Sequence, residues 1–393
     1  MPDGRRFSSG RAAVTVNVAL GLTGVALIAL AAAAGQDWAD RHFLPGFSVS
    51  RALQIGLLQG LRVLLALFGL FLLLFVRPRV ARAIDAGRSA RLLVSALSAT
   101  LAVAAAFVTT EWILRVRAGH ATLAQLQSKE PLRQHDDLVG WVFIPSHHGQ
   151  GETDGRAIDY ATDRFGYRVA RAGDETDTSR PTILFAGESI MNGYGLQWPE
   201  TIPAQVQAMT GVPVANIAVT AHATDQTYMR LRNELPRFAR PIAVVIPFVP
   251  VLFDRNLDQD RPYLDSALRW NPGHSPNLLL MELPGRVLRY RSTAAIDEAV
   301  AMTQAVLRGA IAFARSRGAA VLIVVPQYLP EEPLEASIRR RVLDDGHIPY
   351  LLVRLDPALR LAVDRHPGPR GATAIAAAIS RALAARPDHG ILR

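Results

Sequence analysis

A serine in the middle of the chain and a histidine near its end are the residue types that could carry out covalent chemistry. Ser189 follows the apolar run 182–186, and Asp364 lies two residues before His366. A serine hydroxyl is inert at neutral pH unless a base takes its proton, and the base needs a third group to fix its tautomer. His366 could be the base and Asp364 the third group. The alternative interpretation is structural, because serine is also favoured at the start of a helix.

The run before Ser189 predicts a buried strand that ends in a sharp turn. Pro181 precedes the strand, where its missing N–H costs little, and Gly187 permits a bend that presents Ser189. This bend would place Ser189 at the carboxyl end of a strand. Ligands of open α/β sheets bind at that edge, so the position suits a nucleophile.

From residue 181 to about 388, apolar runs alternate with amphipathic stretches. We expect strands at 182–186, 212–218, 242–248, 320–325 and 350–355, and helices at 199–209, 224–238, 295–317, 333–344 and 370–385. This alternation predicts an α/β domain with a parallel sheet covered on both faces. Residues 253–290 interrupt the rhythm and predict an insertion, either a lid over an acyl or glycan group or a segment that packs on the membrane or the connector.

The net charge of +9 is concentrated in the N-terminal part of the chain. Residues 1–117 contain 13 arginines and 5 acidic residues, whereas the remaining 276 residues are nearly neutral. The arginines flank apolar runs, which is typical of membrane orientation and not of a face that binds nucleic acid. The chain has no cysteine, so disulfides and cysteine-ligated metals are excluded. We expect no cofactor and no metal site.

Three apolar segments, about 12–34, 55–76 and 92–114, are long enough to cross a bilayer and predict a transmembrane anchor over 1–117. Arginines precede the first segment and fill the loop 77–91, which predicts a cytoplasmic N-terminus and a C-terminal domain outside the cytoplasm. The inner membrane, crossed several times, is therefore the expected location. A cleaved signal peptide is the alternative for the first segment, and it also leaves the large domain outside.

The remaining N-terminal features are a connector and two charges within the spans. Residues 118–180 are polar and rich in turns, and predict a connector whose short strands pack on the following domain. Arg62 and Glu111 lie within predicted spans, where a charge usually snorkels or pairs. Snorkelling of Arg62 and an Arg62–Glu111 pair both remain open at this point.

The motifs over residues 135–385 resemble those of the SGNH/GDSL hydrolase superfamily. The first block, a strand followed by Gly-Asp-Ser, is matched by the sequence that ends in Gly187, Glu188 and Ser189, with glutamate in place of aspartate. The second block is matched around Asn216, with Ala221 where the oxyanion glycine is usual. Asp364 and His366 match the last block. The resemblance implies a three-layer α/β/α, flavodoxin-like domain with a Ser-His-Asp triad.

The third block departs from that pattern. The superfamily places an oxyanion asparagine after the third strand, where this chain has Val251 and Leu252. The resemblance implies that the N–H groups of Ser189 and Ala221 bind the oxyanion, since a backbone donor survives a change from glycine to alanine. We consider His222 and Asn256, which lie close by in the chain, as replacements for the missing donor.

Together these features favour a membrane-anchored serine ester hydrolase or O-acyltransferase that acts outside the cytoplasm. Its substrates would be acyl esters, including those of cell-surface glycans, and its other partner the lipid bilayer, with no role for nucleic acid. The missing asparagine leaves open a catalytically impaired module that binds a glycan or a partner protein. A third alternative is a subunit of a membrane complex whose helices are the functional part.

Overall fold

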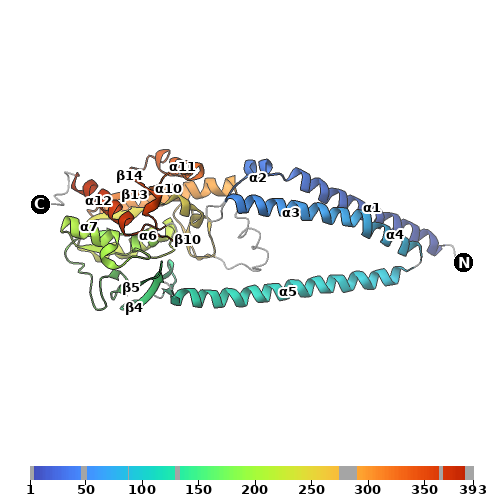
Figure 1. Cartoon of the computed structure of the whole chain (residues 1–393), viewed down its shortest axis with the longest axis horizontal. Coiled ribbons are helices and arrows are strands. Elements are labelled where there is room, and N and C mark those ends of the chain that lie inside the picture. Colours follow the sequence, from blue (N-terminus) through green and yellow to red (C-terminus); the bar gives the residue numbers. More distant parts are fainter. Residues whose placement is uncertain are drawn as a thin grey trace. The chain divides into compact units, whose positions relative to one another are not determined.

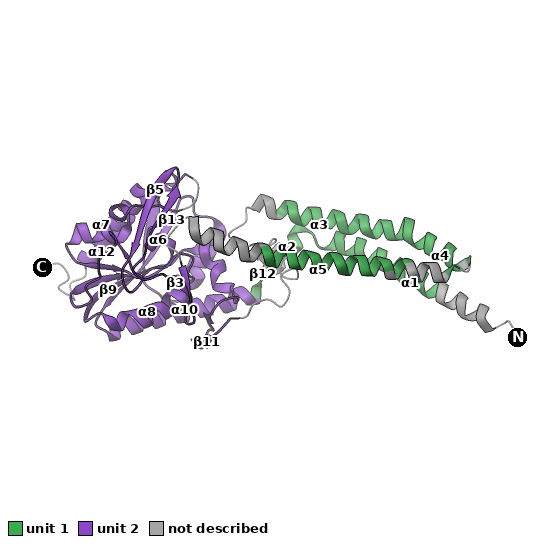
Figure 2. Cartoon of the chain, turned by 90° about the horizontal axis from the view of Figure 1, so that it is seen from below, with its two compact units in different colours: residues 1–118, 277–293 green, residues 119–276, 294–393 purple. Residues whose placement is uncertain are grey.

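The computed structural model describes residues 4–45, 51–86, 88–128, 133–273, 290–362 and 366–385. The chain forms two compact units, shown in different colours in Figure 2. The first contains residues 1–118 and 277–293, and the second contains 119–276 and 294–393. Each unit is described by itself.

The first unit contains the three apolar helical segments. Its elements are α1 (Gly4–Ala33), α2 (Gln36–His42), β1 (Phe43–Pro45), α3 (Arg51–Phe71), a π-helical turn (Leu72–Val76), α4 (Arg77–Asp85) and the first part of α5 (Ser89–Ser128). Three stretches are long and apolar enough to cross a membrane, namely Val14–Ala33, Ile55–Ile84 and Ser98–Val116. The second is longer than the predicted 55–76 because Pro78 falls in the first turn of α4, where proline is tolerated and the helix continues.

Two glycines bring α1 and α3 into close contact. A Cβ atom added at Gly24 would lie 2.9 Å from the carbonyl oxygen of Gly69, and one added at Gly69 would lie 2.6 Å from that of Gly24. Small residues at a crossing let helix backbones approach, which is how apolar helices gain packing energy without a hydrophobic driving force. Larger side chains at either position would separate the two helices.

Arg62 caps α1 and does not pair with Glu111. Its Nε donates to the carbonyl oxygen of Ala31 at 2.7 Å and its Nη2 to that of Ala32 at 3.5 Å. The last carbonyls of a helix have no partner within the helix, so a cation there satisfies them and suits the helix dipole. Glu111 accepts a hydrogen bond from Nε of Arg115, one turn along α5, at 2.7 Å. The Arg62–Glu111 alternative is therefore wrong.

The boundaries of the connector and the insertion differ from the predictions. Helix α5 continues to Ser128, so residues 118–128, predicted to be turn-rich, are helical because their alanines, leucines and glutamines favour a helix. At the end of the insertion, β12 (Tyr290–Ser292) pairs antiparallel with β1 in the loop after the first apolar helix. Much of the insertion, residues 274–289, lies outside the described residues.

The second unit is built on an eight-stranded sheet in the order β14-β13-β9-β7-β8-β6-β5-β4. The strands β7 (Pro181–Phe185), β8 (Val214–Asn216), β9 (Arg240–Pro247), β13 (Ala320–Tyr328) and β14 (Tyr350–Leu355) are parallel, as predicted. The strands β4 (His148–Thr153), β5 (Arg156–Thr162) and β6 (Arg168–Val169) extend the sheet in antiparallel fashion. The segment 118–180 thus contributes strands to the same sheet.

Helices cover both faces of the parallel strands. The helices are α6 (Ser189–Asn192), α7 (Ile202–Thr210), α8 (Thr224–Glu234), α10 (Thr293–Ser316), α11 (Pro333–Arg339) and α12 (Pro369–Ala384). Alternate strand residues such as Ile183 and Phe185 pack with Ile202 of α7 and Ile375 of α12, while Leu184 is buried on the opposite face. Figure 2 shows α7 and α12 on one side of the sheet and α8 and α10 on the other. The domain therefore has three α/β/α layers, as predicted.

Short elements fill the remaining loops. These are β2 (Arg133–Asp136), β3 (Gly140–Phe143), β10 (Tyr263–Leu264), β11 (Trp270–Asn271), the π-helical turn Arg340–Asp344, and the 3₁₀ turns Trp198–Glu200, Leu235–Arg237, Pro250–Leu257 and Pro357–Leu359. Strands β2 and β3 form an antiparallel hairpin, as do β10 and β11. Of these elements, Figure 1 labels β10, and Figure 2 labels β3 and β11.

The connections place a crevice beside β7. After β7 the chain forms β8 on one side of it and then β9 on the other, so the order of the strands reverses at β7. Phe185 at the end of β7 lies opposite Asn216, the last residue of β8. Ligands of open α/β sheets bind at such a switch point, outside the carboxyl ends of the strands. This is where the chain places Ser189.

Candidate active site

The turn after β7 presents Ser189 through a glycine that no other residue could replace without strain. Gly187 has a φ of +144°, and a Cβ atom there would lie 2.6 Å from the Cγ and Cδ atoms of Pro247. Glu188 then caps α6, because its Oε2 accepts the N–H of Ile190 at 3.0 Å. Ser189 is the first residue of that helix and is 1% exposed.

One basic side chain and one acidic side chain lie within hydrogen-bond distance of the Ser189 hydroxyl. Nε2 of His366 lies 2.7 Å from Oγ, although the two residues are 177 positions apart in the sequence. Oε2 of Glu188 lies 2.6 Å from the same oxygen and accepts its proton. Asp364, the predicted third group, lies outside the described residues. The structure thus brings together the predicted serine and histidine and adds a carboxylate.

Arg168 holds the loop that follows the nucleophile. Its guanidinium is 1% exposed and donates to the carbonyl oxygens of Asn192 at 2.8 Å, Gly193 at 2.6 Å and Leu196 at 2.6 Å. It also lies over the ring of Tyr160, 4.4 Å from the ring centre. Burial of a cation is expensive unless its donors are satisfied, so this side chain fixes the backbone of residues 192–196.

That loop also contacts the histidine. The ring of Tyr194 packs against the ring of His366, with centres 4.7 Å apart. The N–H of the next residue, Gly195, donates to the hydroxyl of Tyr160 at 2.9 Å. Through this loop, the buried contacts of Arg168 and Tyr160 influence where the half-buried imidazole of His366 lies.

The turn after β8 contains Ala221 in a conformation that favours glycine. Its φ is +67°, and the N–H of His222 donates to the carbonyl oxygen of Val219 at 3.2 Å to close the turn. A non-glycine residue in this region costs on the order of 1 kcal/mol. Within the described part of the chain, the N–H groups of Ser189 and Ala221 have no hydrogen-bond acceptor. Both remain available to a developing oxyanion.

His222 is oriented as an acceptor, not as a donor to that site. It is 1% exposed, and its Nε2 lies 2.9 Å from the carbonyl oxygen of Trp141, so Nε2 carries the hydrogen. Burial lowers the pKa of His222 to about 3. The hydrogen bond to the Trp141 carbonyl raises this pKa, but its effect is smaller. The imidazole is therefore neutral at pH 7, and Nδ1 presents a lone pair. The indole N–H of Trp141 in turn donates to the carbonyl oxygen of Thr220 at 3.0 Å.

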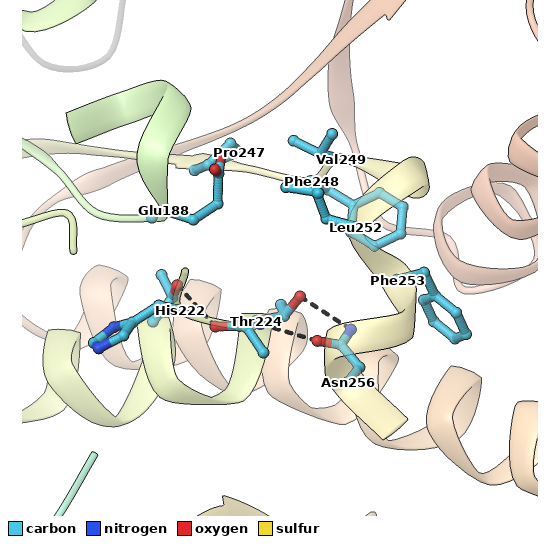
Figure 3. A pocket seen from close by; sticks show the side chains of 12 residues that line it. Glu188, His222, Thr224, Pro247, Phe248, Val249, Leu252, Phe253 and Asn256 are labelled. Atoms are coloured by element: carbon cyan, nitrogen blue, oxygen red, sulfur yellow. Dashed lines mark hydrogen bonds between the residues drawn. The ribbon is translucent and has the colours of Figure 1, made fainter. Parts of the chain in front are cut away.

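Asn256 is held by two threonines. Its Nδ2 donates to Oγ1 of Thr224 at 3.1 Å and of Thr303 at 2.9 Å, and its Oδ1 accepts the N–H of Thr224 at 3.0 Å. Figure 3 shows Asn256 joined to Thr224 on one side of a small cavity, with Glu188 beside Pro247 on the other. Both amide hydrogens are committed, so Asn256 would have to break a bond to reach an oxyanion.

The cavity adjoins the nucleophile turn and leaves about 20 Å³ open to the centre of a water molecule, which is room for one water. Its lining includes Glu188 and His222 together with apolar residues after β9. Leu252 lies in this lining, at a position where an oxyanion asparagine was expected. Across the described ranges, no group of three or more His, Asp or Glu side chains is arranged to hold a metal ion.

Three of the residues that shape this site show no signal in the sequence. Trp141, Tyr160 and Arg168 all lie in the segment interpreted as a connector. Their contacts reach the site from 24 to 81 residues away along the chain. A lone tryptophan or arginine in a polar segment has no periodic pattern, so only the fold reveals its role.

No protein-family model and no curated protein matches the sequence. The chain is similar to the solved structure of a member of the lipolytic protein G-D-S-L family from Veillonella parvula, with 12% identity, 52% of this chain and 99% of that chain covered, and a TM-score of 0.33. A GDSL-like lipase from Bacteroides thetaiotaomicron is 13% identical over 55% of this chain and 92% of its own, with a TM-score of 0.29. A salicylyl-acyltransferase from a tetracycline biosynthetic pathway is 16% identical over 57% of this chain and 61% of its own, with a TM-score of 0.30. The distances around Ser189, rather than these distant neighbours, support the roles proposed for its side chains.

Proposed function

We propose that this protein is a membrane-anchored serine ester hydrolase or O-acyltransferase whose nucleophile is Ser189. The observation that carries the proposal is the 2.7 Å distance between Oγ of Ser189 and Nε2 of His366, two residues from opposite parts of the domain. A serine within hydrogen-bond reach of an imidazole, at the switch point of an α/β sheet, is the arrangement that acyl transfer requires.

In the proposed reaction, Oγ attacks the carbonyl carbon of an acyl ester and forms an acyl-enzyme. His366 exchanges protons with the reacting groups, and Asp364 is proposed to orient it. The free N–H groups of Ser189 and Ala221 would stabilise the negative charge on the carbonyl oxygen. Water as the second nucleophile gives hydrolysis, and a sugar hydroxyl gives transfer to a glycan.

A third oxyanion donor has no candidate among the residues considered from the sequence. His222 presents a lone pair, and both amide hydrogens of Asn256 are bonded to threonines. Loss of one donor lowers the rate of a well-studied hydrolase by about 10²–10³-fold, so we expect slow turnover. The same observation favours the second candidate function, a module that binds an acylated glycan or a partner protein without cleaving an ester.

The catalytic unit is proposed to act on the extracytoplasmic, periplasmic side of the inner membrane. Arginines flank the N-terminal helix and fill the loop 77–91, which favours a cytoplasmic location for both. The pairing of β1 with β12 fits three crossings, because it requires the loop after the first apolar helix and the segment at 290–292 to share one side of the membrane, while the arginines decide which side that is. A reporter that is active only in the cytoplasm, fused after Arg393, should stay inactive; activity would contradict this placement.

The test of the activity uses the full chain, purified in detergent, on a panel of short-chain acyl esters. Wild type should cleave at least one ester, and Ser189→Ala should abolish that cleavage. A sugar acceptor added to the same reaction distinguishes transfer from hydrolysis. If wild type never exceeds Ser189→Ala, the binding module becomes the better account.

A further inference from the structure

The hydroxyl of Ser189 has one proton and two short contacts. Oε2 of Glu188 lies 2.6 Å away and Nε2 of His366 lies 2.7 Å away. A carboxylate oxygen that also accepts the N–H of Ile190 can only accept, so the proton of Oγ lies on the bond to Glu188. The hydrogen on the other bond must then come from Nε2 of His366.

The position of Glu188 is fixed from several directions. Its side chain is 6% exposed, and Oε2 accepts the N–H of Ile190 at 3.0 Å. The rigid turn at Gly187, packed against Pro247, sets the direction in which the side chain leaves the backbone. Arg255 supplies a nearby positive charge that interacts with Glu188. Burial lowers the pKa of its guanidinium, and the Glu188 carboxylate raises that pKa. A hydrogen bond between a hydroxyl and a carboxylate is among the strong ones.

The second oxygen of Glu188 is buried, and its residue lines the small cavity beside the nucleophile turn. Oε1 of Glu188 and Nδ1 of His222 are both buried acceptors without a hydrogen-bond partner among the described residues. Both residues line the cavity that has room for one water. A water that donates to these acceptors would hold Oε1 away from Ser189 and leave Oε2 to receive the proton.

We propose that Glu188 is a second proton acceptor for Ser189, so that Glu188 and His366 divide the proton transfers of the reaction. This inference rests on the proposed function and assigns a catalytic role to a residue that touches the reacting oxygen. A helix cap alone would need only the bond to Ile190, whereas the additional contact at 2.6 Å places the carboxylate on the nucleophile.

The proton transfers balance without a further reagent. As Oγ bonds to the acyl carbon, its proton moves to Oε2 of Glu188 and the carbonyl π electrons move to the carbonyl oxygen. Breakdown cleaves the bond to the leaving alkoxide, which takes the proton from Nε2 of His366, so that His366 enters this step as an imidazolium and leaves it as a neutral imidazole. In the second half, water or a sugar hydroxyl gives a proton to Nε2 as its oxygen attacks, and the departing Oγ recovers its proton from Glu188. Each group ends in the state in which it began.

The test measures how fast a fluorophosphonate labels Ser189 in the full chain. Fluoride leaves without needing a proton, so the labelling rate reports the removal of the serine proton and not the protonation of a leaving group. Glu188→Gln should slow labelling by about 10²-fold, the usual contribution of a general base. His366→Gln should slow it by a smaller factor. Glu200→Gln is the matched control. It also removes a carboxylate that accepts a backbone N–H, that of Gln197 at 2.9 Å, and the labelling rate should be unchanged.

Several results would overturn the inference. Wild-type labelling rates in Glu188→Gln, or a larger loss in His366→Gln than in Glu188→Gln, would show that His366 alone takes the proton. If Glu188→Gln does not fold, Glu188→Asp replaces it, and its shorter carboxylate should still slow labelling by about 10-fold; an unchanged rate would contradict the role. Failure of the proposed function looks different, because then wild type is neither labelled at Ser189 nor faster than Ser189→Ala on esters, and the inference falls with it.

Discussion

The turn after β7 and the turn after β8 meet at the same edge of the sheet but are stabilised in different ways. The first turn uses glycines at positions 187, 193 and 195, each with a positive φ, and its carbonyls are held by the buried guanidinium of Arg168. The second turn places an alanine, Ala221, at a φ of +67° and is held from outside by Trp141.

This difference shows what each turn must preserve. The first turn must place a side chain, Ser189, within tenths of an ångström, so its backbone has little room for any Cβ atom. The second turn must only present a backbone N–H, so it tolerates a residue other than glycine at a cost in strain. Substitutions in the first turn should therefore have larger effects than those in the second.

The largest effect is expected at Arg168. Arg168→Met removes the donors from three buried carbonyls, and each buried group left without a partner costs about 1–3 kcal/mol. We expect a loss of about 3 kcal/mol or more in the free energy of unfolding of the second unit, together with the loss of ester cleavage. Thermal unfolding measures this loss, and Arg171→Met, at an exposed position, is the matched control. Equal melting temperatures for the two variants would contradict the role of Arg168.

Gly187→Ala should lower the rate of ester cleavage by about 10²-fold. The added Cβ atom would meet the rigid ring of Pro247 at 2.6 Å and displace Ser189 from His366. Gly211→Ala serves as the control, because Gly211 also has a positive φ but no atom lies within 4 Å of an added Cβ. The control should lose about 1 kcal/mol of stability and keep its activity. Similar rates in both variants would show that the turn is less rigid than its contacts indicate.

In the second turn, His222 predicts a dependence of stability on acid. Its pKa is about 3 when folded and about 6.5 when unfolded, so between these values the unfolded chain binds more protons. Stability should therefore be complete above pH 6.5 and fall on acidification, with this residue contributing up to about 1.4 kcal/mol per pH unit. His222→Gln should show a shallower fall between pH 6.5 and the acid limit of folding, measured by denaturant unfolding at several pH values. An unchanged slope would contradict the burial of a neutral imidazole.

The smallest effect is expected at Ala221. Ala221→Gly relieves the strain at φ +67° but increases the freedom of the unfolded chain, so stability should change by less than about 1 kcal/mol and activity should persist. Ala221→Val adds a branched side chain at the same φ and should lose more than 1 kcal/mol together with part of the activity. If both variants behave alike in unfolding and in the ester assay, the conformation of this turn is unimportant for the site.

The sequence predicted the parallel part of the sheet because its strands are apolar runs bounded by turns. The predicted strand 350–355 coincides with β14, and the predicted α/β/α layers are confirmed by the strand order and the core. The sequence predicts short strands in the connector but not where β4 to β6 lie, because β4 is a polar run with two glycines, β5 mixes polar and apolar residues, and β6 has only two residues. Local pattern locates a strand where the strand is a continuous apolar run.

For the site, motif order selected Ser189 and His366, which the structure brings to 2.7 Å. The contact between Glu188 and Ser189 could not be predicted, because it depends on the turn at Gly187, which packs against Pro247, 60 residues further along the chain. For His222, whether a nitrogen donates or accepts depends on the carbonyl of Trp141, which is 81 residues away. Such roles follow from long-range geometry, which neighbouring residue types do not encode.

The central claim is that Ser189 forms a covalent acyl-enzyme, and the most direct measurement is the intact mass of the full chain quenched during turnover of a short acyl ester. The account predicts that the mass increases by one acyl group, that peptide mapping places this group on Ser189, and that Ser189→Ala shows no increase. An ester that is cleaved without any adduct on Ser189, or an adduct that persists in Ser189→Ala, would contradict it.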